Sequence, residues 1–136
     1  MAFSDFETEQ IRKALLAETR RCAVTLGMRK TSVDQLTQAV GISKGSFYRF
    51  FASKELLFFA VLEDIHTELY DVADGVLREN IGLPPAERVA KAILAVCKRM
   101  SDTGVMTFIE NDVAALLQRL PENIKAEHYH DDETHI

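Results

Sequence analysis

Apolar residues recur at every third or fourth position through most of the chain, a spacing that predicts an all-α fold. The first helix begins at Ser4, which opens a capping-box sequence, and it ends at Gly27. Ser32 opens a second, short helix that Gly41 closes. A third short helix is predicted over residues 44–51. No stretch of the chain alternates in the way that a half-buried strand would.

The second half of the chain is predicted to hold longer helices. One apolar stripe covers residues 53–79, and a proline pair then separates it from a helix at 85–100. A loop at 101–104 and a helix at 105–120 follow, and the tail 122–136 is polar. The helix at 85–100 carries one apolar face, formed by Val89, Ile93, Val96, Cys97 and Met100.

Residues 36–50 have the spacing of a helix-turn-helix. Apolar residues bracket Gly41, which adopts a positive φ at little steric cost, so two short helices can cross steeply and share a small core. Phe47 and Phe50 are predicted to face that core, and the positions between them point outward. Side chains of the outward-facing types contact phosphates and base edges. The outward-facing residues are Lys44, Gly45, Ser46, Tyr48 and Arg49.

The charge distribution divides the chain behind the third helix. The 136 residues are 47% hydrophobic and 27% charged, which is typical of a soluble globular protein, and the net charge is -5. Residues 1–54 carry nine Lys/Arg and five Asp/Glu, whereas residues 55–136 carry seven and sixteen. A basic head on an acidic body is the pattern expected of a polyanion-binding module joined to a separate unit.

The head closely resembles the DNA-binding domain of TetR-family transcriptional regulators. The resemblance covers residues 8–62 and is carried by Thr31-Ser32-Val33, Gln35-Leu36 and VGISKGSFYRFFASKELL at residues 40–57. Thr37 stands where such motifs usually place alanine, so the crossing of the two helices has to accommodate a hydroxyl.

The resemblance implies a helix-turn-helix DNA-binding domain at residues 1–52 and a helical effector-binding and dimerisation domain at 53–136, coupled by the helix 53–79. Residues 44–51 would be the recognition helix. By matching position, Thr31 and Ser32 would contact the DNA backbone, Lys44, Gly45, Ser46 and Arg49 would face the major groove, and Tyr48 and Lys54 would contact phosphates.

The length of the chain bears on the body. Family members usually continue with two further helices that build the dimer, so we expect either a chain that is incomplete at its C-terminus or an unusual dimer. An incomplete body would expose the apolar faces of the helices at 85–100 and 105–120.

A candidate effector pocket surrounds the predicted loop at 101–104. Four apolar residues cluster there, and methionine adapts well to varied ligands. Packing in the core explains the same residues at least as well, so both interpretations stay open. The residues are Met100, Met106, Phe108 and Ile109.

Other candidate chemistry adds no function. His128 and His130 are two positions apart, a spacing that points the imidazoles away from each other on a helix, so we assign no metal site. Cys22 and Cys97 are predicted to be reduced core residues. The sequence has no Gly-rich phosphate loop and no nucleophile and base at a recognised spacing, so we expect neither an enzyme nor a cofactor.

Together these observations predict a cytoplasmic, homodimeric transcriptional regulator. As a TetR-like protein, most often a repressor, it would bind a near-palindromic operator in double-stranded DNA and release it when a small-molecule effector enters the body. The longest apolar run is far shorter than a membrane span, so no membrane partner is expected. The alternative is a truncated helix-turn-helix module that binds another protein and does not bind DNA alone.

Overall fold

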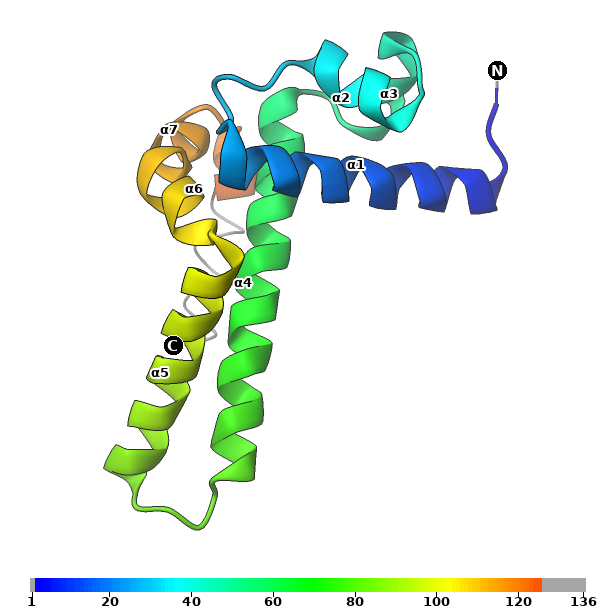
Figure 1. Cartoon of the computed structure of the whole chain (residues 1–136). Coiled ribbons are helices and arrows are strands. Elements are labelled where there is room, and N and C mark those ends of the chain that lie inside the picture. Colours follow the sequence, from blue (N-terminus) through cyan, green and yellow to red (C-terminus); the bar gives the residue numbers. More distant parts are fainter. Residues whose placement is uncertain (1, 126–136) are drawn as a thin grey trace.

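The computed structural model describes residues 2–125, and within them the chain folds into seven α-helices (Figure 1). No strand occurs in this range, so the predicted all-α fold is confirmed. The helices are α1 (Asp5–Thr25), α2 (Val33–Val40), α3 (Lys44–Phe50), α4 (Lys54–Glu79), α5 (Pro85–Thr103), α6 (Val105–Asn111) and α7 (Val113–Gln118).

Serine side chains start the first four helices. Ser4, Ser32, Ser43 and Ser53 each have an extended backbone and accept a hydrogen bond from an amide in the following turn. At Ser4 and Ser32 the third helical residue bonds back to the serine amide, which completes two capping boxes. Each cap stabilises its helix by about 1 kcal/mol. The predicted starts of these helices are therefore confirmed.

Two buried clusters form the interior, and α1 and α4 contribute to both. In Figure 1, α1 crosses the upper half of α4. The helices α2 and α3 lie above α1, and α6 and α7 lie to the left of α4. The head cluster consists of Leu15, Cys22, Leu36, Phe47, Phe51 and Leu57. The body cluster contains residues of α1, α4, α6 and α7, among them Ala23, Phe58, Phe108 and Leu116.

α4 and α5 form an antiparallel hairpin that extends away from the head (Figure 1). α5 packs chiefly against α4, and Ala92 is the one residue of this described helix that is buried. On the predicted apolar face Val89 and Ile93 are 51% and 57% exposed, which confirms the expected exposure there, whereas Val96 and Met100 are half-buried. Cys97 is also exposed, and its prediction as a core residue is wrong because α5 has too few neighbouring helices to cover it.

The boundary between α5 and α6 is a single residue. The sequence predicted a loop at 101–104, whereas α5 continues to Thr103 and α6 begins at Val105. Gly104 lies between them with a φ of 73°, a left-handed conformation that lets glycine turn the chain in one residue. The predicted loop is therefore wrong except at Gly104.

The predicted helix at 105–120 is divided at Asp112 into α6 and α7. The carboxylate of Asp112 accepts a hydrogen bond from the backbone N–H of Met28 at 3.1 Å, across 84 positions of sequence. A contact between residues so far apart could not be predicted from the local sequence pattern. The expected exposure of this segment's apolar face is also wrong, because Phe108 and Leu116 are fully buried.

The described residues contain neither a membrane span nor a metal centre. None of the helices within 2–125 combines the length and the apolar character needed to cross a membrane. Over the same residues, no group of three or more His, Cys, Asp or Glu side chains could hold a metal ion. His128 and His130, considered above as metal ligands, lie outside the described residues.

Replacement of Phe58 tests the body cluster. Phe58 is fully buried, and its ring centroid lies 6.1 Å from that of Phe108. Because truncation leaves a cavity, we expect Phe58→Ala to lower the free energy of unfolding by about 3–5 kcal/mol, measured by chemical denaturation. Phe6 is 73% exposed, so Phe6→Ala is a matched control that should change this free energy by less than about 0.5 kcal/mol. Equal losses in the two variants would contradict the assignment.

Candidate nucleic-acid interface

The turn between α2 and α3 sets the angle at which the two helices cross. Gly41 has a φ of 84°, and the N–H groups of Gly41 and Ile42 both donate to the carbonyl of Thr37, at 2.8 and 3.1 Å. Among the described residues, nothing lies within 4 Å of a Cβ placed on Gly41, so backbone conformation rather than space requires glycine. The buried Thr37 hydroxyl donates to the carbonyl of Asp34 at 3.1 Å, which accommodates it at the crossing.

α3 presents polar side chains to solvent above a buried aromatic ring. Phe47 is fully buried, whereas Tyr48, the next residue, is 49% exposed and meets the Phe47 ring edge-on at 5.2 Å. This alternation follows from the helical period, which points consecutive residues in different directions. The remaining groove-facing candidates lie on the accessible side of the helix: Lys44, Gly45 and Arg49 are exposed and Ser46 is half-buried.

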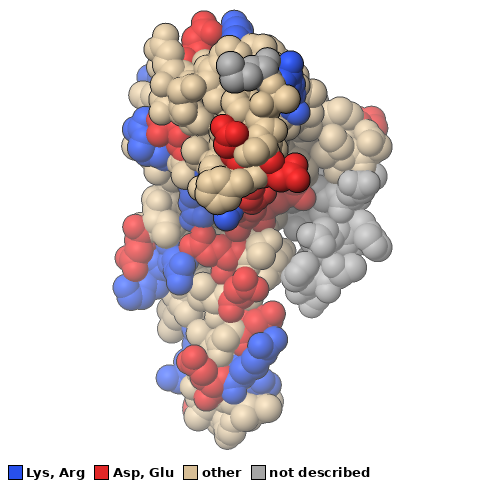
Figure 2. Space-filling model, turned by 90° about the vertical axis from the view of Figure 1, so that its right-hand side faces the viewer, with Lys and Arg blue, Asp and Glu red and all other residues tan. Residues whose placement is uncertain are grey.

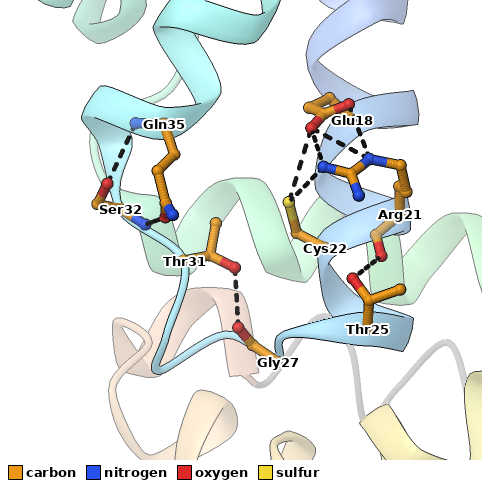
Figure 3. Close-up of polar contacts among 8 residues, drawn as sticks. All are labelled: Glu18, Arg21, Cys22, Thr25, Gly27, Thr31, Ser32 and Gln35. Atoms are coloured by element: carbon orange, nitrogen blue, oxygen red, sulfur yellow. Dashed lines mark hydrogen bonds and ion pairs between the residues drawn. The ribbon is translucent and has the colours of Figure 1, made fainter.

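The two backbone-contact candidates before α2 have different surroundings (Figure 3). Thr31 is buried, and its hydroxyl donates to the carbonyl of Gly27 at 2.8 Å, so this side chain holds the loop. Ser32 is exposed, and its hydroxyl oxygen accepts a hydrogen bond from the backbone N–H of Gln35 at 3.1 Å. A hydroxyl keeps its own proton as a donor while its oxygen accepts. Ser32 therefore retains a hydrogen-bond donor for a ligand, whereas the Thr31 hydroxyl is already used.

Lys54 makes contacts within the chain that its sequence position did not reveal. Its ammonium donates to the carbonyl of Met28 and to the carbonyl of Thr31, both at 2.9 Å. These two bonds use two of the three donors of the ammonium and join the start of α4 to the loop before α2. The contact found for Lys54 is therefore to this loop, and the phosphate contact stays a prediction.

A hollow of about 360 Å³ lies between this loop and the start of α3. It is lined by the loop, by Lys44, Lys54 and Tyr48, and by the basic pair Arg29 and Lys30, both of which are exposed. This pair was not predicted from the sequence, although two consecutive cations one residue away from the helix cap Ser32 were a usable signal. The hollow gathers four cations against one carboxylate, and such a surface favours a polyanion.

Basic side chains do not form a continuous patch over the face of the molecule shown in Figure 2. On the face shown in Figure 2, acidic and basic side chains are interspersed over the head and along the hairpin.

One ion pair crosses the hollow, because Lys44 lies 3.5 Å from the carboxylate of Asp34, and both side chains are well exposed. An exposed pair of this kind contributes about 0–1 kcal/mol, so it does not commit Lys44 to this partner.

Cys22 lies at the edge of the head cluster beside an exposed ion pair (Figure 3). Burial raises the pKa of the Cys22 thiol, which keeps it neutral and unreactive. Its prediction as a reduced core residue is confirmed. The neighbouring Arg21 donates to Glu18 at 2.6 Å, and this hydrogen bond lowers the pKa of the Glu18 carboxyl.

Glu68 joins three helices by ion pairs. On α4 it lies 2.7 Å from Arg20 of α1 and 2.8 Å from Arg99 of α5, and all three residues border a hollow of about 700 Å³. Partial burial alone would raise the pKa of Glu68, but the hydrogen bonds from both arginines outweigh it and hold that pKa below its ordinary value. This ion-pair cluster therefore links the head to the hairpin.

The four effector-pocket candidates separate into two pairs. Met100 and Met106 line a hollow of about 390 Å³ around Gly104. Phe108 is fully buried against Phe58, and Ile109 packs on the body cluster, so neither residue lines that hollow. For Phe108 the core interpretation therefore fits, because its side chain faces the interior.

Comparison with known proteins identifies the head. The family described as bacterial regulatory proteins of the tetR family matches residues 15–61. Similar relatives include the HTH-type transcriptional repressor Rv1474c of Mycobacterium tuberculosis, at 33% identity over 54% of this chain and 42% of the relative. The head of this chain is therefore similar to the DNA-binding part of the TetR family.

Two further relatives overlap with part of this chain. The nucleoid occlusion factor SlmA of Glaesserella parasuis is 35% identical over 50% of this chain and 32% of the relative. The HTH-type transcriptional repressor DhaR of a Mycobacterium species is 26% identical over 71% of this chain and 48% of the relative. The chain thus spans less than half the length of each of these three relatives.

The match to the tetR family, at residues 15–61, includes most of the candidate nucleic-acid interface. It runs from the middle of α1 to the first two turns of α4, so it contains both helices of the helix-turn-helix, the basic pair before α2 and Lys54. The match ends before Glu68 and leaves out α5, α6 and α7.

The Glu68 ion pairs predict a pH dependence of stability. Because the folded-state pKa of Glu68 is lowered, its contribution is present above the unfolded value near 4.5 and is lost as pH falls through the folded value. We expect Glu68→Gln to lower the free energy of unfolding by about 1 kcal/mol at neutral pH and by less at pH values below the folded pKa. Denaturant titrations at two pH values measure the difference, with the exposed Glu110→Gln as control. A pH-independent loss would contradict this account.

Proposed function

We propose that this chain is a sequence-specific, DNA-binding transcriptional regulator that acts in the cytoplasm. The observation that carries the proposal is the polar face of α3, held above the buried Phe47 and next to the basic hollow. A helix presented in this way fits the major groove, while neighbouring cations meet phosphates. The names of the relatives as transcriptional repressors support the same class of function.

In this proposal Lys44 and Arg49 contact base edges. Both are exposed on α3, and cationic side chains donate to the O6 and N7 acceptors of guanine in the major groove. Gly45 has no side chain to separate the helix from the DNA, and Ser46 lies beside it near the start of α3. Lys44 exchanges its exposed ion pair with Asp34 for DNA at little cost.

Phosphate contacts come from the surroundings of the hollow. The Tyr48 hydroxyl, the Ser32 hydroxyl and the cations of Arg29 and Lys30 all border it. Such contacts set the orientation of α3 without reading sequence, and they make affinity fall steeply with salt.

The regulatory part of the proposal is a homodimeric repressor that releases DNA when a small molecule binds the body. Two recognition helices related by a two-fold axis reach successive major grooves about 34–36 Å apart, which matches a near-palindromic operator. α4 runs unbroken from the head to the tip of the hairpin, so a ligand that tilts it changes this separation. The hollow at Met100 and Met106 is the candidate effector site.

The exposed face of α5 favours a second candidate function. Val89, Ile93 and Leu94 are all more than half exposed, and apolar surfaces of this kind commonly bind another protein. In this alternative the chain is a helix-turn-helix module that pairs with another regulator and does not bind DNA alone. Its complex would depend weakly on salt, unlike a complex with DNA.

Selection from a random library of duplexes tests the two candidates directly. The selection is done at physiological salt, and light scattering gives the oligomeric state of the same sample. Enrichment of an inverted repeat by a dimer is the outcome expected of the regulator. Absence of any enriched duplex would contradict it for this chain and favour the interaction module.

Two substitutions on α3 should have different effects on the selected duplex. Tyr48→Ala removes a phosphate contact, so we expect similar weakening on all sequences and a salt slope reduced by about one. Arg49→Ala removes a base contact and should also relax sequence preference, at about 1–3 kcal/mol. Affinities measured by fluorescence anisotropy at several salt concentrations separate the two. Lys91→Ala, at an exposed cation on α5, is the control, and unchanged affinity in both α3 variants would refute the assignment.

A further inference from the structure

The peptide groups of Met28 are held from two sides by side chains far apart in the sequence. The Met28 N–H donates to the carboxylate of Asp112 at 3.1 Å, and the Met28 carbonyl accepts from the ammonium of Lys54 at 2.9 Å. The Met28 side chain is buried in the body cluster. The loop that leads into α2 is therefore fixed both by the start of α4 and by the junction of α6 and α7.

Asp112 makes this contact instead of capping its own helix. It precedes α7, where an aspartate commonly accepts from the amides of the following turn, yet no side-chain cap bond forms there. The carboxylate oxygen that accepts from Met28 also lies against Gly27, because a Cβ at Gly27 would be 3.3 Å from it. Gly27 also has a φ of 84°, so both its conformation and its lack of a side chain suit the approach of Asp112.

We propose that Asp112 is a positioning residue for DNA binding, supplied by the body to the head. This inference rests on the proposed DNA-binding function. Arg29 and Lys30 directly follow Met28 and line the basic hollow together with Lys44. With Met28 held, the two cations and the start of α2 are already placed for the DNA backbone. Without the carboxylate, the loop has to be ordered during binding, which weakens the complex.

Because Asp112 is acidic, electrostatic repulsion and the positioning role predict opposite changes in DNA affinity when it is replaced. Removal of an acidic side chain reduces repulsion of phosphates, so electrostatics alone predicts tighter DNA binding for any replacement. The positioning role predicts that Asp112→Ala binds more weakly, by about tenfold, as expected for the loss of a hydrogen bond to a carboxylate. Asp112→Asn keeps a side-chain oxygen that accepts from the Met28 N–H, and it should bind at least as tightly as the unchanged chain.

The binding experiment uses the selected duplex and a double-mutant cycle. Affinities are measured for Asp112→Ala and Asp112→Asn, alone and combined with Arg29→Ala and Lys30→Ala, at a temperature where thermal melts show each variant folded. The loss caused by Asp112→Ala should become smaller when both cations are absent, because only the start of α2 is then left to position. Glu110→Ala removes an exposed acid of α6 and is the charge control, which should not weaken binding.

Amide hydrogen exchange of the protein without DNA tests the contact itself. Asp112→Ala should speed exchange at the Met28 amide by about tenfold, and Asp112→Asn should preserve its protection. Unchanged exchange in Asp112→Ala overturns the inference. So does an Asp112→Ala variant that binds DNA as tightly as the unchanged chain, or whose loss of affinity is undiminished without Arg29 and Lys30. If the unchanged chain binds no duplex, the proposed function fails, and this inference fails with it.

Discussion

The packing of α4 at two adjacent residues joins the head to the body. Leu57 is buried in the head cluster, and Phe58, the next residue, is buried in the body cluster. Consecutive residues of a helix point about 100° apart, so a single turn of α4 serves both interiors. Rotation of the head on the body would expose one of these side chains, at a cost of about 1.5–3 kcal/mol or more. The ion pair between Arg20 of α1 and Glu68 of α4 depends on this fixed relation of the two helices.

Polar contacts then fix backbone groups that apolar packing alone does not define. In the loop before α2 the Met28 side chain is buried in the body cluster, and the backbone groups are held by Lys54 and Asp112. Glu68 in the same way joins α1 and α5 across α4. These contacts are directional, so they set position more than stability. The surface that we propose for DNA therefore receives its shape from residues on α4 and at the junction of α6 and α7.

Local features could be predicted from the sequence, and features that depend on distant residues could not. The caps at Ser4 and Ser32 and the turn at Gly41 involve neighbours within four residues, so the local sequence is enough to predict them. The break at Asp112 depends on a partner 84 positions away, and no periodicity reveals it. Cys97 was misplaced because a helical pattern identifies an apolar face without showing whether another helix covers it. The exposed face of α3 followed from the pattern, whereas the contacts of Lys54 required the fold.

The central claim is that the head, through α3 and the loop before α2, is the surface that meets DNA. Amide chemical shifts recorded by nuclear magnetic resonance during titration with the selected duplex test this claim most directly, because they report every contact region at once. The account predicts that shifts concentrate at residues 29–32 and 44–49, while the amides of α5 stay unchanged. Shifts confined to α5 around Ile93, with the head unaffected, would contradict it.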